Sequence, residues 1–384
     1  MRPMLRAGQA ECEKAGRIPD VTNDAFVKAG FYRTLQPRRF GGYEFDVPTF
    51  LRVMMEVARG CPESGWVLAL TAGHAHLMAS FPEEGQRDAY GSRGEFRGPA
   101  AFNPPGAAIP AEGGFIVTGA WDYASGCDIA THFLGLAPIK VSAGEPPQGT
   151  IAMLFEREQI RIVDNWHVMG MQGTGSRRVI VENVFVPVHR TLVLADAAGA
   201  FFPDRPGLAG HPNPMYHGRV TSFLVGEAAA VAVGAARGAL DIYEEVLRTK
   251  KTHFPPFNRR QDETLFQNSY GRAYSLVCTA EAALIRAGEE YMEYCREQAA
   301  GGAPFGEARE RRLTLIEQQC SELGWRAVEL MFRAAGTSAA NADAPLGRYF
   351  RNLAVIMTHL AMQSDLSGTN AARLQFGLPT LSRN

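Results

Sequence analysis

The chain has 384 residues, and its 39 basic and 40 acidic side chains give a net charge of −1 at pH 7. This balance offers nucleic acid no basic face and creates no field that attracts an anionic membrane. A hydrophobic fraction of 46% and a charged fraction of 21% are typical of a globular protein. The length predicts two or three domains.

The sequence contains no expected membrane span, leader or metal site. The longest apolar run, residues 223–236, is interrupted by Glu227 and is rich in Ala and Gly, which predicts a buried helix. The first residues carry positive charges with no apolar core after them, so no signal peptide is expected. Six scattered cysteines without a CxxC pair predict reduced thiols in a cytoplasmic protein.

Residues 1–93 are expected to form an N-terminal helical domain. Apolar residues recur at helical spacing over 49–58, directly after Pro48. Residues 64–79 are apolar on every side, which predicts a buried helix. Pro82 then opens a polar helix.

Residues 94–206 are expected to form a middle β domain, because Gly and Pro become frequent and β-rich runs replace helical patterns. The runs suggest a small antiparallel sheet and cover residues 114–118, 133–139, 150–155, 159–163 and 178–186. In the last run the alternation of valines slips at Glu182 and Asn183, which predicts a bulge or a turn.

Residues 207–384 are expected to form a C-terminal four-helix bundle. A linker rich in Pro, Gly and His covers 207–216, and helices are predicted over about 220–250, 263–299, 305–335 and 346–363. The whole chain is therefore predicted to have a mostly helical α+β fold with the order helical, β, helical bundle.

One motif that could carry chemistry is GAWDYASGCDIA, residues 119–130, which joins two β runs. Ser125 can donate and accept a hydrogen bond, and Gly126 allows a flat ring to approach closely. The indole ring of Trp121 could form one side of an apolar cleft. The alternative interpretation is a polar β-turn beside a core tryptophan.

A second motif is NWHVMGMQGTGS, residues 165–176, which is rich in glycine and hydroxyl groups. The segment around Gly173, Thr174 and Ser176 could present backbone N–H groups to a carbonyl or phosphate oxygen. A strand is expected after it rather than a helix, so it is not a dinucleotide-binding fingerprint. A bulged hairpin loop is the alternative.

Histidines and arginines provide further candidates. His74 and His76 point to different sides of an apolar helix, and His359 lies in another apolar run. Each could hold a phenol, or could be a hydrogen-bonded core residue. Arg348 and Arg351 flank an aromatic pair at a helix start, where they could bind phosphate, pair with carboxylates or lie in solvent. No histidine spacing indicates a metal site.

Two segments carry a resemblance to a known fold. FGGYEFDVPTFLRVMMEVARGCPESGWVLAL is similar to the N-terminal helical region of acyl-CoA dehydrogenase-fold proteins, and WHVMGMQGTGSRRVIVENVFVP resembles their middle domain. The expected C-terminal helices are similar to their four-helix bundle. The resemblance covers about residues 18–380.

Within that fold, the sequence resembles one branch more than another. Acyl-CoA dehydrogenases commonly carry a Glu-Gly-Thr near the C-terminus, where this chain has Ser367, Gly368 and Thr369, and serine cannot act as the base at neutral pH. WDYASGCDIA and GHAHLMASFP are similar to the reduced-flavin monooxygenases that include p-hydroxyphenylacetate hydroxylase oxygenases and steroid-phenol hydroxylases.

This resemblance implies roles for particular residues. Ser125 matches the serine that hydrogen-bonds the flavin N5. His74 matches a substrate-side histidine, with His76 as a weaker candidate, and His359 matches a histidine on a late bundle helix. Metal ligands are not expected. The complete set of expected cofactor-binding residues is Trp121, Ser125, Gly126, Gly173, Thr174, Ser176, Arg348 and Arg351.

The resemblance also implies a reaction. An NAD(P)H-dependent flavin reductase would supply reduced FMN or FAD, O2 would form a C4a-hydroperoxyflavin, and this oxygenase component would hydroxylate a phenolic, indolic or polycyclic small molecule. A homotetramer is expected. The alternatives are an acyl-CoA dehydrogenase-type flavoenzyme, an N- or S-oxygenase of the same fold, and a non-catalytic subunit derived from the fold.

Overall fold

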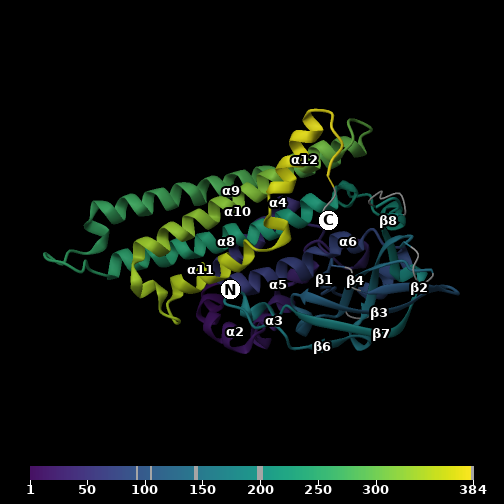
Figure 1. The fold of residues 1–384 in the computed structure, drawn as a ribbon, viewed down its shortest axis with the longest axis horizontal. Coiled ribbons are helices and arrows are strands. Elements are labelled where there is room, and N and C mark those ends of the chain that lie inside the picture. The colour runs from purple at the N-terminus through teal and green to yellow at the C-terminus, as the bar shows by residue number, and fades with distance from the viewer. Residues whose placement is uncertain (92–93, 104–105, 142–145, 197–201, 382–384) are drawn as a thin grey trace.

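The computed structural model describes residues 1–91, 94–103, 106–141, 146–196 and 202–381 (Figure 1). The architecture is α+β and mostly helical, as predicted. Long C-terminal helices lie side by side on one side of the molecule, and the strands gather on the other.

The N-terminal part of the chain is helical. Helix α4 begins after Asp46, whose side chain accepts the N–H of Thr49 and so caps the helix. Helix α5 packs against α4, α8 (Val220–Thr249) and the 3-10 turn η5 (Gln172–Thr174), which explains why it is apolar all round. The helices are α1 (Arg2–Ala7), α2 (Gln9–Ala15), α3 (Asp20–Ala29), α4 (Val47–Gly60), α5 (Pro62–Gly73), α6 (Ala75–Met78) and α7 (Glu83–Gly91).

The middle region contains two four-stranded sheets where a single small sheet was expected. One has the order β1-β4-β5-β8, with β1 and β4 parallel, and the other has the order β2-β3-β7-β6. A separate core cluster of buried side chains from both sheets joins them. The strands are β1 (Ala100–Ala101), β2 (Ala107–Ala111), β3 (Gly114–Ala124), β4 (His132–Pro138), β5 (Gly149–Glu156), β6 (Arg161–Val163), β7 (Arg177–Pro187) and β8 (Thr191–Asp196).

The predicted slip in the last β run is confirmed as a bulge. The register between β3 and β7 shifts after Val117, and Asn183 has a positive φ of 54°. The hydroxyl of Thr118 accepts the N–H of Asn183, which satisfies a backbone donor that the ladder leaves unpaired.

The C-terminal helices form the bundle, and the last predicted helix is shorter than expected. Helix α11 ends at Ile356, so His359 lies in the following turn, where its Nδ1 accepts the N–H of Ala361. The side chain thus replaces the backbone partner that a continuing helix would supply. The helices are α8 (Val220–Thr249), α9 (Thr264–Ala299), α10 (Glu307–Ala335), α11 (Pro345–Ile356) and α12 (Asp365–Gln375).

Helix α8 contains the longest apolar run and lies inside the bundle. Among the described residues it is the one helix that is long and apolar enough to cross a membrane, but 83% of its most apolar window is buried inside the protein. It packs against α4, α5, α10 and α11. The apolar composition of α8 therefore serves the core, as the sequence predicted.

Candidate functional site

A row of hydroxyl groups joins the turn after β3 to the glycine-rich turn before β7. Trp66 Nε1 donates to Ser125 Oγ over 3.0 Å, and Ser125 Oγ lies 2.7 Å from Ser176 Oγ. Ser176 Oγ lies 2.6 Å from Thr174 Oγ1, which donates to the carbonyl of Met171 over 2.8 Å. These hydroxyls are nearly buried, so their hydrogen bonds form in a dry environment.

Gly126 holds this row against helix α5. Its φ is +79°, and its N–H donates to the carbonyl of Thr174 over 2.9 Å. An added Cβ would lie 2.8 Å from Cγ1 of Val67 on α5. Glycine is therefore required by the positive φ and by the close helix. The structure thus brings Ser125, Gly126, Thr174 and Ser176 together.

His359 reaches the same place from the C-terminal region. Its ring meets the ring of Trp66 edge to face, with centroids 5.1 Å apart and an interplanar angle of 76°. His359 is exposed, whereas Trp66 is buried. The N-terminal helices, the β region and the C-terminal bundle therefore all contribute to one group of side chains. Trp66 was missed as a site residue, although it lies in the serine-tryptophan stretch that carried the resemblance.

His74 lies at the other end of α5 and has a separate set of contacts. Its Nδ1 is 2.7 Å from the carbonyl of Gly98, and its ring is edge-on to Phe102. A carbonyl only accepts, so Nδ1 carries the proton and Nε2 keeps a lone pair. Burial lowers the pKa of His74 to about 4, and the ring is therefore neutral near pH 7. Nε2 has no hydrogen-bond partner among the described residues.

Glu227 lies next to His74 and was not predicted as a site residue. Its Oε1 is 3.9 Å from Nε2 of His74, and neither carboxyl oxygen accepts or donates a hydrogen bond within the described residues. Burial raises its pKa well above the usual value, because an isolated charge there is costly. The signal was present in the sequence as the one acidic residue in the apolar run.

His76, the weaker candidate, has the contacts of a core residue. Its Nε2 is 3.0 Å from the carbonyl of Met215 and 3.1 Å from the hydroxyl of Tyr291, and its ring stacks on Phe223. These contacts are those of the hydrogen-bonded core alternative, although Nδ1 of His76 has no hydrogen-bond partner among the described residues.

Replacing His76 by glutamine is expected to change how stability depends on pH. Burial lowers the pKa of His76 from 6.5 to about 4, so the folded state binds fewer protons than the unfolded state between these values. The histidine therefore costs stability as pH falls from about 6.5 towards 4, at up to about 1.4 kcal/mol per pH unit.

The measurement is the free energy of unfolding in urea at several pH values. His76→Gln can still donate to Met215, and its stability relative to wild type should rise as the pH is lowered. A difference that stays constant between pH 7 and pH 4.5 would contradict the assignment.

Three expected cofactor-binding residues are not brought to this group. Trp121 is fully buried between the two sheets, where its Nε1 donates to the carbonyl of Leu136 over 2.7 Å. Arg348 and Arg351 both bind the carboxylate of Glu13 on α2 over 2.6 Å. Their charges are therefore already compensated, as in the carboxylate-pairing alternative.

Gly173 serves close packing as well as the turn. Its N–H donates to Oε1 of Glu63 over 2.8 Å, and an added Cβ would lie 2.3 Å from Sγ of Cys12. The backbone N–H at this position is therefore already used within the protein. Gly173 fixes the glycine-rich turn against α2 and α5, which sets the position of Thr174 and Ser176.

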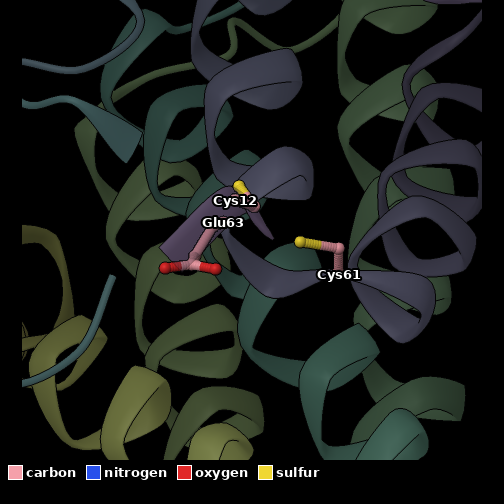
Figure 2. A group of neighbouring side chains, drawn as sticks. All are labelled: Cys12, Cys61 and Glu63. Atoms are coloured by element: carbon pink, nitrogen blue, oxygen red, sulfur yellow. The ribbon is translucent and has the colours of Figure 1, made fainter. Parts of the chain in front are cut away.

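Figure 2 shows that the side chains of Cys12, Cys61 and Glu63 are neighbours, and the backbone of Gly173 contacts Glu63 and Cys12. One ligand atom from each lies within 4.8 Å of the others, so the group could hold a metal ion such as Zn²⁺. All three residues are buried, and Oε2 of Glu63 has no hydrogen-bond partner in the part of the chain that the structure describes. The spacing in the sequence did not reveal this group, because helix packing brings Cys12 to the other two.

Replacing Glu63 by glutamine tests whether this group needs an ion. Burial raises the pKa of Glu63 from 4.5 to about 8, so without an ion the folded state keeps a proton that the unfolded state loses. Wild type then loses stability as pH rises from about 4.5 to 8, by up to a few kcal/mol. Glutamine does not titrate and still accepts the N–H of Gly173.

The stability of Glu63→Gln relative to wild type should therefore increase with pH, measured by urea unfolding with and without EDTA. A wild type that EDTA destabilises, and a variant that is less stable at every pH, would instead identify a bound ion.

Comparison with known proteins places the chain among flavin-dependent enzymes. Residues 227–364 match the family model described as acyl-CoA dehydrogenase, C-terminal domain. The chain is 30% identical over 379 residues to the flavin-dependent monooxygenase, oxygenase subunit HsaA, of Rhodococcus jostii, covering 98% of this chain and 96% of the relative. It is 27% identical to the oxygenase component of FADH(2)-dependent resorcinol hydroxylase of Rhizobium, covering 98% and 92%.

A solved structure agrees with these relatives. XiaF from Streptomyces, in complex with FADH2 and glycerol, superimposes with a TM-score of 0.90 at 25% identity, covering all of this chain and 94% of the other.

Proposed function

The chain belongs to the family of flavin-dependent monooxygenase oxygenase subunits with the acyl-CoA dehydrogenase fold, and from this premise we propose a reaction for it. It receives reduced FMN or FAD from a separate NAD(P)H-dependent reductase and uses O2 to hydroxylate an aromatic small molecule. The relative that acts on resorcinol supports a phenolic substrate, and indolic or polycyclic compounds are the other expected classes. The expected homotetramer stays a prediction.

The observation that carries this proposal is the junction of Ser125, Trp66 and His359, where three parts of the chain meet. Ser125 uses one lone pair to accept from Trp66, and a second lone pair is left for a ligand. The row of hydroxyl groups ends at Ser125, whose hydroxyl can form a hydrogen bond with an atom at the edge of a flavin ring. When bound, reduced flavin supplies the electrons that activate O2.

The surrounding residues have distinct tasks. Ser125 holds the flavin by a hydrogen bond, and Trp66 excludes water beside it. His359, which is exposed and contacts the ring of Trp66, orients the substrate. Nε2 of His74, at the far end of α5, has no hydrogen-bond partner among the described residues and can accept a hydrogen bond from a phenol hydroxyl. Positioning of this kind contributes several kcal/mol in enzymes.

The test is anaerobic titration with oxidised and with reduced FMN and FAD, followed by a pulse of oxygen. We expect tight binding of a reduced flavin and a transient absorbance after oxygen is added. Tight binding of oxidised FAD that bleaches with an acyl-CoA thioester would instead identify a dehydrogenase. Failure to bind either redox form would identify a non-catalytic subunit.

A further inference from the structure

The hydrogen-bond row at Ser125 has a direction that its two ends impose. Trp66 Nε1 can only donate, and the carbonyl of Met171 can only accept. If Thr174 donates to Met171, then Ser176 must donate to Thr174, and Ser125 must donate to Ser176. In this arrangement each hydroxyl proton has one acceptor, and every contact in the row is a hydrogen bond.

In this arrangement Ser125 has one hydrogen-bonding position that is not used. Its proton is directed to Ser176 and one lone pair accepts from Trp66, so its second lone pair remains. Towards a ligand, Ser125 is therefore an acceptor and not a donor. The two redox states of flavin differ at the atom concerned, because N5 of reduced flavin carries a hydrogen whereas N5 of oxidised flavin has only a lone pair.

We propose that Ser176 and Thr174, by directing the proton of Ser125 inward, make the site select reduced flavin over oxidised flavin. The proposal rests on the proposed function, which places N5 at Ser125. It assigns a specificity-determining role to two residues that do not themselves need to touch the ring.

Oxidised flavin can still bind, but only if the row reverses. Ser125 would then donate to N5, Ser176 to Ser125, and Thr174 to Ser176, so Thr174 would give up its bond to Met171. The carbonyl of Met171 keeps the indole N–H of Trp166 as a donor. The reversal therefore costs about one buried hydrogen bond, which corresponds to roughly a threefold to tenfold preference.

The test compares dissociation constants for the oxidised and the reduced form of one flavin, measured anaerobically by fluorescence or absorbance. In Ser176→Ala the proton of Ser125 has no inward acceptor and is free for oxidised N5. The ratio of the two constants should fall by roughly threefold to tenfold, mainly because oxidised flavin binds more tightly. Thr174→Val removes the end of the row and should change the ratio in the same direction.

A matched control is Thr71→Val, which removes a buried hydroxyl that donates to Val67 within α5 and is not part of the row. Its ratio should equal that of wild type. Folded Ser176→Ala and Thr174→Val proteins with an unchanged ratio would overturn the selection mechanism while leaving the proposed function intact. A wild type that binds neither redox form would overturn both.

Discussion

Ser125→Ala is expected to shorten the lifetime of the transient absorbance that follows oxygen addition by roughly tenfold to a hundredfold. The substitution removes the hydroxyl next to the proposed flavin edge and also leaves the indole N–H of Trp66 without its 3.0 Å partner. A buried hydrogen bond from the flavin edge to Ser125 would stabilise the adduct against decay by about 1–3 kcal/mol, and each 1.4 kcal/mol changes a rate about tenfold.

The lifetime is measured by stopped-flow absorbance after the complex with reduced flavin is mixed with oxygenated buffer. Ser80→Ala is the matched control, because the hydroxyl of Ser80 is fully buried and has no hydrogen-bond partner in the described part of the chain. Its lifetime should equal that of wild type. A lifetime in Ser125→Ala that also equals wild type would remove Ser125 from this role.

Gly73→Ala is expected to lower the free energy of unfolding by about 1–3 kcal/mol, as overpacking of a buried site does. An added Cβ would lie 1.8 Å from Oε2 of Glu227 and 3.4 Å from Phe50. Glu227 is fully buried, so its carboxyl group can move away only by displacing packed neighbours. The variant should therefore also change the position of the His74 ring, because His74 follows Gly73 directly and its Nε2 faces the same carboxyl group.

A double-mutant cycle shows whether the clash with Glu227 is the cause. Glu227→Ala should rescue Gly73→Ala, with a coupling energy of about 0.5–3 kcal/mol in urea unfolding at pH 7. Gly368→Ala is the control, since Gly368 lies within helix α12 with no described atom within 4 Å of an added Cβ, and it should stabilise by about 0.5–1 kcal/mol. If the effects of the two substitutions on the free energy of unfolding are additive, the clash with Glu227 is not the cause.

The sequence by itself determined the order of the three regions, helical, β and helical again, and several of their elements. The helix start near Pro48, the apolar surface of α5 and the slip at Asn183 were all readable, because proline preference at helix starts, helical periodicity and strand alternation depend on residues near one another in the chain. The resemblance then supplied the fold, which the comparisons confirm. Its match at Ser125 and His359 led to residues that both contact Trp66 in the structure.

Tertiary structure decided what each candidate side chain contacts, since its partners come from distant parts of the chain. Arg348 and Arg351 bind Glu13, more than 330 residues away, and no local pattern could show that pairing. Trp121 is enclosed between two sheets. The same long-range packing brought Trp66 to Ser125, Glu227 to His74 and Cys12 to Cys61. The residue types could be read along the chain, whereas their burial and partners exist only in the folded protein.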